Sequence, residues 1–118
     1  MATEADVRKI ALFLPETTEE PWYGSPAYKV KGRGFLRLRT EAEGGLVVFI
    51  SGPDEKEMLL SSAPKKYFTT PHYKGGNTIL INLTAVGVRE LRDLITESWR
   101  LQAPPTLRAA YDGDHQRR

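Results

Sequence analysis

WYGSPAYKVKGRGFLRLR, residues Trp22 to Arg39, alternates apolar and polar side chains with a period of two. This period is typical of β-strands, because successive side chains of a strand point to opposite faces of the sheet. Gly32 and Gly34 supply the permissive backbone that a tight reversal needs. The stretch therefore predicts a hairpin whose two strands cover Ala27–Lys31 and Phe35–Thr40.

The two faces of this predicted hairpin differ in chemistry. One face is apolar and is expected to pack against a core: Tyr28, Val30, Leu36 and Leu38. The other face carries five cations and is expected to lie in solvent: Lys29, Lys31, Arg33, Arg37 and Arg39. The net charge is only +2, which by itself does not indicate a nucleic-acid partner. The local concentration of positive charge is therefore the feature that points to a charged ligand.

The rest of the chain predicts helices and further strands. Helical periodicity favours helices over Thr3–Leu14, Pro53–Ser62 and Gly87–Ala103, and apolar runs favour strands over Leu46–Ile50, Tyr67–Tyr73 and Thr78–Leu83. An acidic loop is expected between the first helix and the first strand. The order α-β-β-β-α-β-β-α predicts an α+β two-layer sandwich, with helices on one face of an antiparallel sheet.

The composition of the C-terminal residues predicts where the domain ends. Residues 1–111 are expected to form a single domain, in which Thr106–Tyr111 adds one helical turn after Pro104 and Pro105. Residues 112–118 are polar and terminal and include a glycine, so we expect a disordered tail.

Composition excludes several functional classes. The chain has no cysteine, and His72 and His115 are its two histidines, too few for a histidine-based triad or metal cluster. No helix is expected after Gly32-x-Gly34, so this is not a phosphate-binding loop. We therefore expect no enzyme activity, no metal and no cofactor. No apolar run reaches the roughly 18 residues of a membrane span, and the acidic, then amphipathic N-terminus is not typical of a signal peptide, so we expect a cytoplasmic protein without membrane contact.

Three separated blocks of the chain resemble the MmcQ/YjbR family of small bacterial proteins: WYGSPAYKVKGRGFLRLR, DEKEMLLSSAPKKYFTTPHY and VRELRDLITESWRLQAP. The resemblance spans about Val7 to Tyr111 and implies the same element order, in a fold similar to that of type III secretion chaperones. It also implies DNA binding through a "double wing" of basic hairpins, which by position would be Lys29–Arg39 and Lys66–Asn77. One departure is Arg33-Gly34, where many relatives carry a lysine. The resemblance brings no catalytic residues.

Nucleic-acid binding without catalysis is the leading hypothesis, with DNA as the partner. Cations at alternate positions of a strand lie about 6.6 Å apart and can follow a phosphate backbone. Phe35 is expected to be exposed among them as a stacking or wedge residue. The full set of predicted contacts is Lys29, Lys31, Arg33, Phe35, Arg37, Arg39, Lys66, His72 and Lys74. The plainer interpretation is a solvated strand face whose cations pair with Glu41, Glu43 or Glu57.

Two other interpretations stay open. The chain could be a protein-interaction adaptor or chaperone-like module that acts through an apolar groove or a sheet edge, as a monomer or weak dimer. Trp22 and Tyr23 are expected in a loop beside the first strand, where they could line a groove for a small molecule. Trp99 is expected to belong to the core, because it lies on the apolar stripe of the last long helix.

Overall fold

The computed structural model describes residues 1–22, 24–40 and 43–116, and for residues 115 and 116 the backbone alone. Within these ranges the elements are, in chain order, α1 (Glu4–Phe13), β1 (Thr17–Trp22), β2 (Ser25–Val30), β3 (Arg33–Leu38), β4 (Leu46–Phe49), α2 (Pro53–Ser62), β5 (Tyr67–Phe68), β6 (Thr78–Ile81), a 3-10 turn (Leu83–Ala85), α3 (Val88–Gln102) and α4 (Pro105–Gln116).

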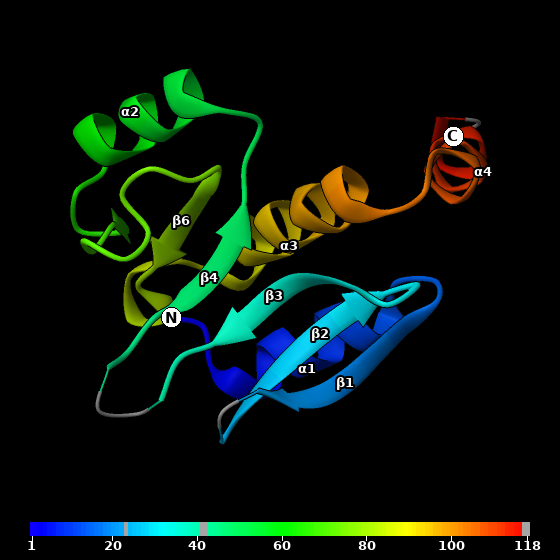
Figure 1. Ribbon diagram of the computed structural model, residues 1–118, viewed down its shortest axis with the longest axis horizontal. Helices are drawn as coiled ribbons and strands as arrows, with labels where there is room; N and C mark the ends of the chain where they lie inside the picture. The colour runs from blue at the N-terminus through cyan, green and yellow to red at the C-terminus, as the bar shows by residue number, and fades with distance from the viewer. Residues whose placement is uncertain (23, 41–42, 117–118) are drawn as a thin grey trace.

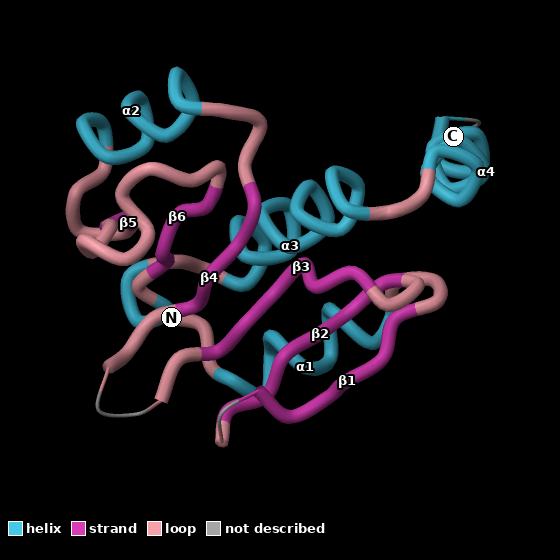
Figure 2. The backbone as a smooth tube through the Cα atoms, viewed as in Figure 1, coloured by secondary structure: helices cyan, strands magenta, loops and turns pink. Residues whose placement is uncertain are grey.

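The strands form one antiparallel six-stranded sheet in the order β1-β2-β3-β4-β6-β5. Helices α1 and α3 pack against one face of it, as Figures 1 and 2 show. The core between these two layers includes Val7, Leu36, Val48, Ile79, Leu91, Ile95 and Trp99. The predicted α+β sandwich is therefore confirmed, and Trp99 is fully buried as expected. No helix in the described part of the chain is both long and apolar enough to cross a membrane.

Strand β1 replaces the acidic loop that the sequence predicted, so that expectation was wrong. All six residues pair with β2, from Thr17 opposite Val30 to Trp22 opposite Ser25. The acids are tolerated because β1 lies at the edge of the sheet, where their side chains reach solvent or a basic partner. Glu19, for example, accepts a hydrogen bond from the guanidinium of Arg8 on α1 at 2.8 Å. The order thus gains a strand before the predicted first one.

A β-bulge in β3 overturns the exposed position expected for Phe35. Tyr28 lies opposite Leu36 and Lys29 lies opposite Gly34, so Phe35 is the extra residue on its strand. The bulge breaks the alternation of faces, and the side chains of both Phe35 and Leu36 are buried in the core. Ser98 on α3 stabilises the bulge, because its hydroxyl donates a hydrogen bond to the Phe35 carbonyl.

The end of β5 and the C-terminus of the chain also differ from expectation. The strand predicted over Tyr67–Tyr73 stops at Phe68, and residues 69–77, which include Pro71, form an irregular segment. At the C-terminus, α4 continues through Asp112 to Gln116, where the sequence predicted a disordered tail. Asp112 accepts two hydrogen bonds from Arg100 on α3, at 2.9 and 2.8 Å. This bidentate ion pair holds the start of the predicted tail in the helix.

Candidate functional site

The face of the sheet away from α1 and α3, called the open face below, carries a mixed row of side chains. Residues directly opposite each other on paired strands share a face. The register therefore places one row across all six strands: Glu20, Ala27, Arg37, Val47, Leu80 and Phe68. Lys29, two residues beyond Ala27, and Phe49, two residues beyond Val47, extend the same face. Cations and apolar side chains thus lie side by side on it.

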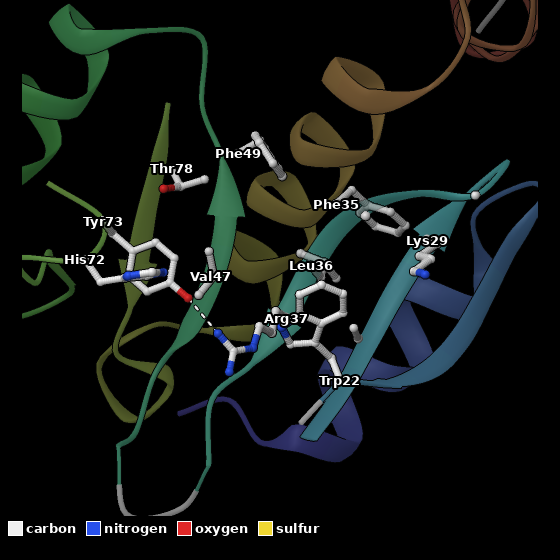
Figure 3. Close-up of a pocket in the computed structure, with 13 residues that line it drawn as sticks. Trp22, Lys29, Phe35, Leu36, Arg37, Val47, Phe49, His72, Tyr73 and Thr78 are labelled. Atoms are coloured by element: carbon white, nitrogen blue, oxygen red, sulfur yellow. Dashed lines mark hydrogen bonds between the residues drawn. The ribbon is translucent and has the colours of Figure 1, made fainter. Parts of the chain in front are cut away.

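The irregular segment 69–77 lies beside this row and is tied to it. The hydroxyl of Tyr73 accepts a hydrogen bond from Nη1 of Arg37 at 2.8 Å, and Figure 3 shows this bond in front of β4 beside Val47. The ring of His72 meets the ring of Tyr73 edge-on, with 4.8 Å between the ring centroids. Two aromatic side chains from the segment therefore stand over the open face.

Lys56 on α2 holds the segment in place. Its ammonium donates to the carbonyl of Tyr73, and to those of Lys74 and Gly76 at 3.1 Å each. The side chain is buried, with the residue only 6% exposed, and this burial lowers the pKa of the ammonium. A charged group at this position is stabilised by the three carbonyl oxygens that surround it.

A cavity of about 460 Å³ lies on the open face between the segment and β2. Its floor is apolar and includes Val47 and Phe49, while polar groups and aromatic rings form its rim. The rim comprises Trp22, Lys29, Arg37, His72, Tyr73 and Thr78 (Figure 3). Trp22 is 44% exposed, at the end of β1 and not in a loop as predicted.

The charges of the predicted basic hairpin are partly compensated. Ion pairs join Lys29 to Glu20 at 3.2 Å, Lys31 to Glu16 at 3.4 Å and Arg39 to Glu43 at 3.6 Å. Glu43 was an expected partner, whereas the β1 side of the sheet supplies the other two acids. Within the described residues, Arg33 and Arg37 have no carboxylate at ion-pair distance. The expectation of five solvent-exposed cations holds for Lys31 and Arg33, whereas Lys29, Arg37 and Arg39 are half-buried.

The predicted contact residues fall into separate places. Lys29, Arg37 and His72 meet at the cavity, whereas Lys31 and Arg33 lie at the β2–β3 turn, where Lys31 has a positive φ of 51°. Phe35 also lines this cavity, although its side chain is fully buried. The others stand apart: Arg39 donates to the Gly44 carbonyl at 3.2 Å, Lys66 pairs with Glu90 at 3.1 Å, and Lys74 is exposed. Tyr23 lies outside the described residues.

Arg37 is the most unusual of these groups. Its Nε–H is buried and has no hydrogen-bond partner in the described part of the chain. Leaving a buried donor without an acceptor costs about 1–3 kcal/mol. Nη1 of the same guanidinium donates to Tyr73, so Nε is the atom that would gain from an additional acceptor at the cavity.

Lys56 and the apolar floor were not predicted from the sequence, and Tyr73 was not among the predicted contact residues. The apolar character of both Val47 and Val48 was the available signal, since a strand that is apolar on both faces needs cover on both. Nothing in the sequence indicated that Lys56 is buried, because that depends on the path of the irregular segment.

Comparison with known proteins identifies the family. The YjbR family model matches residues 12–101, which is most of the chain. The chain belongs to the YjbR family. Uncharacterized proteins of Mycobacterium tuberculosis and Mycobacterium bovis are each 36% identical to it over an alignment of 124 residues, covering 94% of this chain and 96% of theirs.

A solved structure supports the fold of this YjbR protein. The crystal structure of the Deinococcus radiodurans protein DR2400, a DUF419 domain, aligns with a TM-score of 0.71 over 86% of this chain and 78% of that one. The two sequences are 22% identical, so the likeness establishes the shared fold and carries no function.

Proposed function

We propose that this YjbR protein binds nucleic acid through the open face of its sheet and without catalysis. DNA is the favoured ligand. The observation that supports the proposal is the shared cavity rim, where Lys29 and Arg37 stand beside the aromatic rings of Trp22, His72 and Tyr73. Cations that bind phosphates and aromatic rings that stack on bases are the usual components of such surfaces. This role also fits the cytoplasmic location that the sequence predicts.

The charges available for phosphates are those without a carboxylate partner. Arg37 faces the cavity, while Arg33 at the β2–β3 turn and Lys74 in the 69–77 segment are exposed. Lys29 is paired with Glu20, but a partly exposed ion pair contributes only about 0–1 kcal/mol. A phosphate can therefore replace Glu20 at little cost. The proposed interface is therefore the open face of the sheet and not the whole of the basic hairpin that the sequence predicted.

The test is a fluorescence-anisotropy titration with short single- and double-stranded DNA and RNA at low and near-physiological salt. We expect affinity to fall steeply with salt, and R37Q to weaken binding about tenfold and to reduce the salt slope by about 1. The matched control is R92Q, which removes an exposed arginine from α3 on the other side of the sheet. Flat titrations at low salt would overturn the proposal, and so would equal losses in R37Q and R92Q.

A protein partner is the second candidate, and Phe13 is the observation that favours it. This side chain is 88% exposed at the end of α1, next to the partly exposed Leu12. An exposed aromatic and an exposed aliphatic side chain together form a small apolar patch of the kind that binds other proteins. Binding to such a partner would respond little to salt, and F13A would weaken it.

A further inference from the structure

The cavity on the open face is large enough to hold more than a phosphate group. At about 460 Å³ it lies within the range of small-ligand pockets, which runs from roughly 300 to 1,000 Å³. Val47 and Phe49 line its floor, and Trp22 and Tyr73 offer aromatic faces at its rim (Figure 3). A recess of this kind suits a flat, apolar ring with polar edges.

The polar groups of the rim match the edges of such a ring and the phosphates beside it. Thr78 and Tyr73 carry hydroxyls that can donate or accept hydrogen bonds. The guanidinium of Arg37 is bonded to Tyr73, and its buried Nε–H has no partner among the described residues. A ligand that brings a hydrogen-bond acceptor to this guanidinium would satisfy that donor. Lys29 stands on the β2 side of the recess.

The frame of the recess is fixed before any ligand arrives. Val47, Arg37 and Lys29 are on strands of the central sheet, and Lys56 clamps the segment that carries His72 and Tyr73 through its carbonyls. Groups held in place in the free protein lose little entropy on binding. The recess is thus preorganised for a single inserted group.

We propose that the cavity receives one unstacked base of a single strand, so that the ligand of the open face is single-stranded nucleic acid and not a duplex. The inference rests on the proposed function and specifies its partner. A duplex keeps its bases stacked and paired, and removing one base from the stack is energetically unfavourable. A single strand presents its bases freely to Trp22 and its phosphates to Arg37 and Lys29.

The experiment compares five proteins, the unchanged chain and the variants W22A, W22F, F13A and R37Q, against two probes, oligo(dT) and the matching oligo(dA)·oligo(dT) duplex. We expect the unchanged protein to prefer oligo(dT), and W22A to lower that affinity about fivefold to a hundredfold while changing duplex affinity less than twofold. W22F retains an aromatic ring and should recover most of the affinity. F13A removes an exposed aromatic side chain from α1 and should change neither affinity.

Tryptophan emission gives a second readout from the same titration. Trp99 is fully buried whereas Trp22 is 44% exposed, so quenching by oligo(dT) would report on Trp22. Quenching by oligo(dT) that is lost in W22F supports the inference. Equal affinity for both probes, with W22A unchanged and R37Q weakened, would overturn the base-insertion inference and leave the proposed function standing. Binding to neither probe at low salt would overturn both.

Discussion

Replacing Lys56 with methionine tests whether one buried ammonium holds the 69–77 segment over the open face. The substitution keeps an unbranched side chain, one heavy atom shorter, but removes the charge and all three donors. Three carbonyl oxygens, those of Tyr73, Lys74 and Gly76, then lose their partner. The segment carries Tyr73, whose hydroxyl bonds Arg37, so the effect should extend to the cavity.

The expected magnitude follows from these contacts. A hydrogen bond from a charged donor contributes about 1.5–3 kcal/mol, which gives several kcal/mol for three bonds. Two terms reduce this sum. The K56M variant no longer has to bury a charge, and the carbonyls of the exposed residues Lys74 and Gly76 can turn to water. We therefore expect the free energy of unfolding to fall by about 2–4 kcal/mol.

Two measurements check this expectation. Urea unfolding followed by circular dichroism gives the loss of global stability, and hydrogen exchange gives the local effect. The amides of Tyr73 and Gly76, which bond the carbonyls of Thr70 and Tyr73, should exchange faster in K56M. K9M on α1 is the matched control, because Lys9 is exposed, and it should change stability by less than about 0.5 kcal/mol. A loss below about 1 kcal/mol in K56M with unchanged exchange of segment 69–77 would refute the clamp.

Three further predictions concern the frame of the fold. S98A removes a buried hydroxyl that bonds two backbone groups, and should cost about 2–4 kcal/mol by urea unfolding, against less than about 1 kcal/mol for S61A on the exposed surface of α2. Burial and then the nearby Glu19 carboxylate raise the pKa of Tyr28 from 10.0 to about 12, so its contribution to stability is complete below pH 10 and is lost from pH 10 to about 12. Y28F should flatten this alkaline decline in melting temperature, and an unchanged decline would contradict the assignment. G45A should lower stability by about 1–3 kcal/mol, because Gly45 has a φ of +95° and an added Cβ would lie 2.8 Å from the Phe68 ring; a neutral result in thermal unfolding would show that the turn relaxes freely.

The fold class could be predicted because its signals are local. The apolar stripe of α3, the alternation in β2 and the glycine-containing turns each act over a few residues, and together they limit the possible architectures. Strand β1 could not be predicted in the same way. Its sequence TTEEPW is acidic and contains a proline, and it becomes a strand because β2 offers a free edge with a matching register.

The candidate site could be predicted only in part, because one bulge and one loop control it. The parity of Lys29 and Arg37 correctly placed them on the same face, but the face is a cavity rim and not an open ribbon. Phe35 was misplaced because a single extra residue in β3 reverses the alternation on which the prediction depended. The position of Tyr73 depends on contacts from α2, distant in sequence, which no local pattern reports.

Strand β1 also limits what the sheet can do in the presence of other molecules. Pro21 lies directly opposite Pro26, and two prolines can face each other only at a pair that exchanges no hydrogen bonds. Pro21 therefore turns its missing donor outward, and the acids Glu19 and Glu20 precede it on the same border. An incoming strand would meet a gap in the ladder and a negative charge. At high protein concentration the sheets are thus hindered from pairing edge to edge along β1, which protects the protein against fibrous self-assembly at that edge.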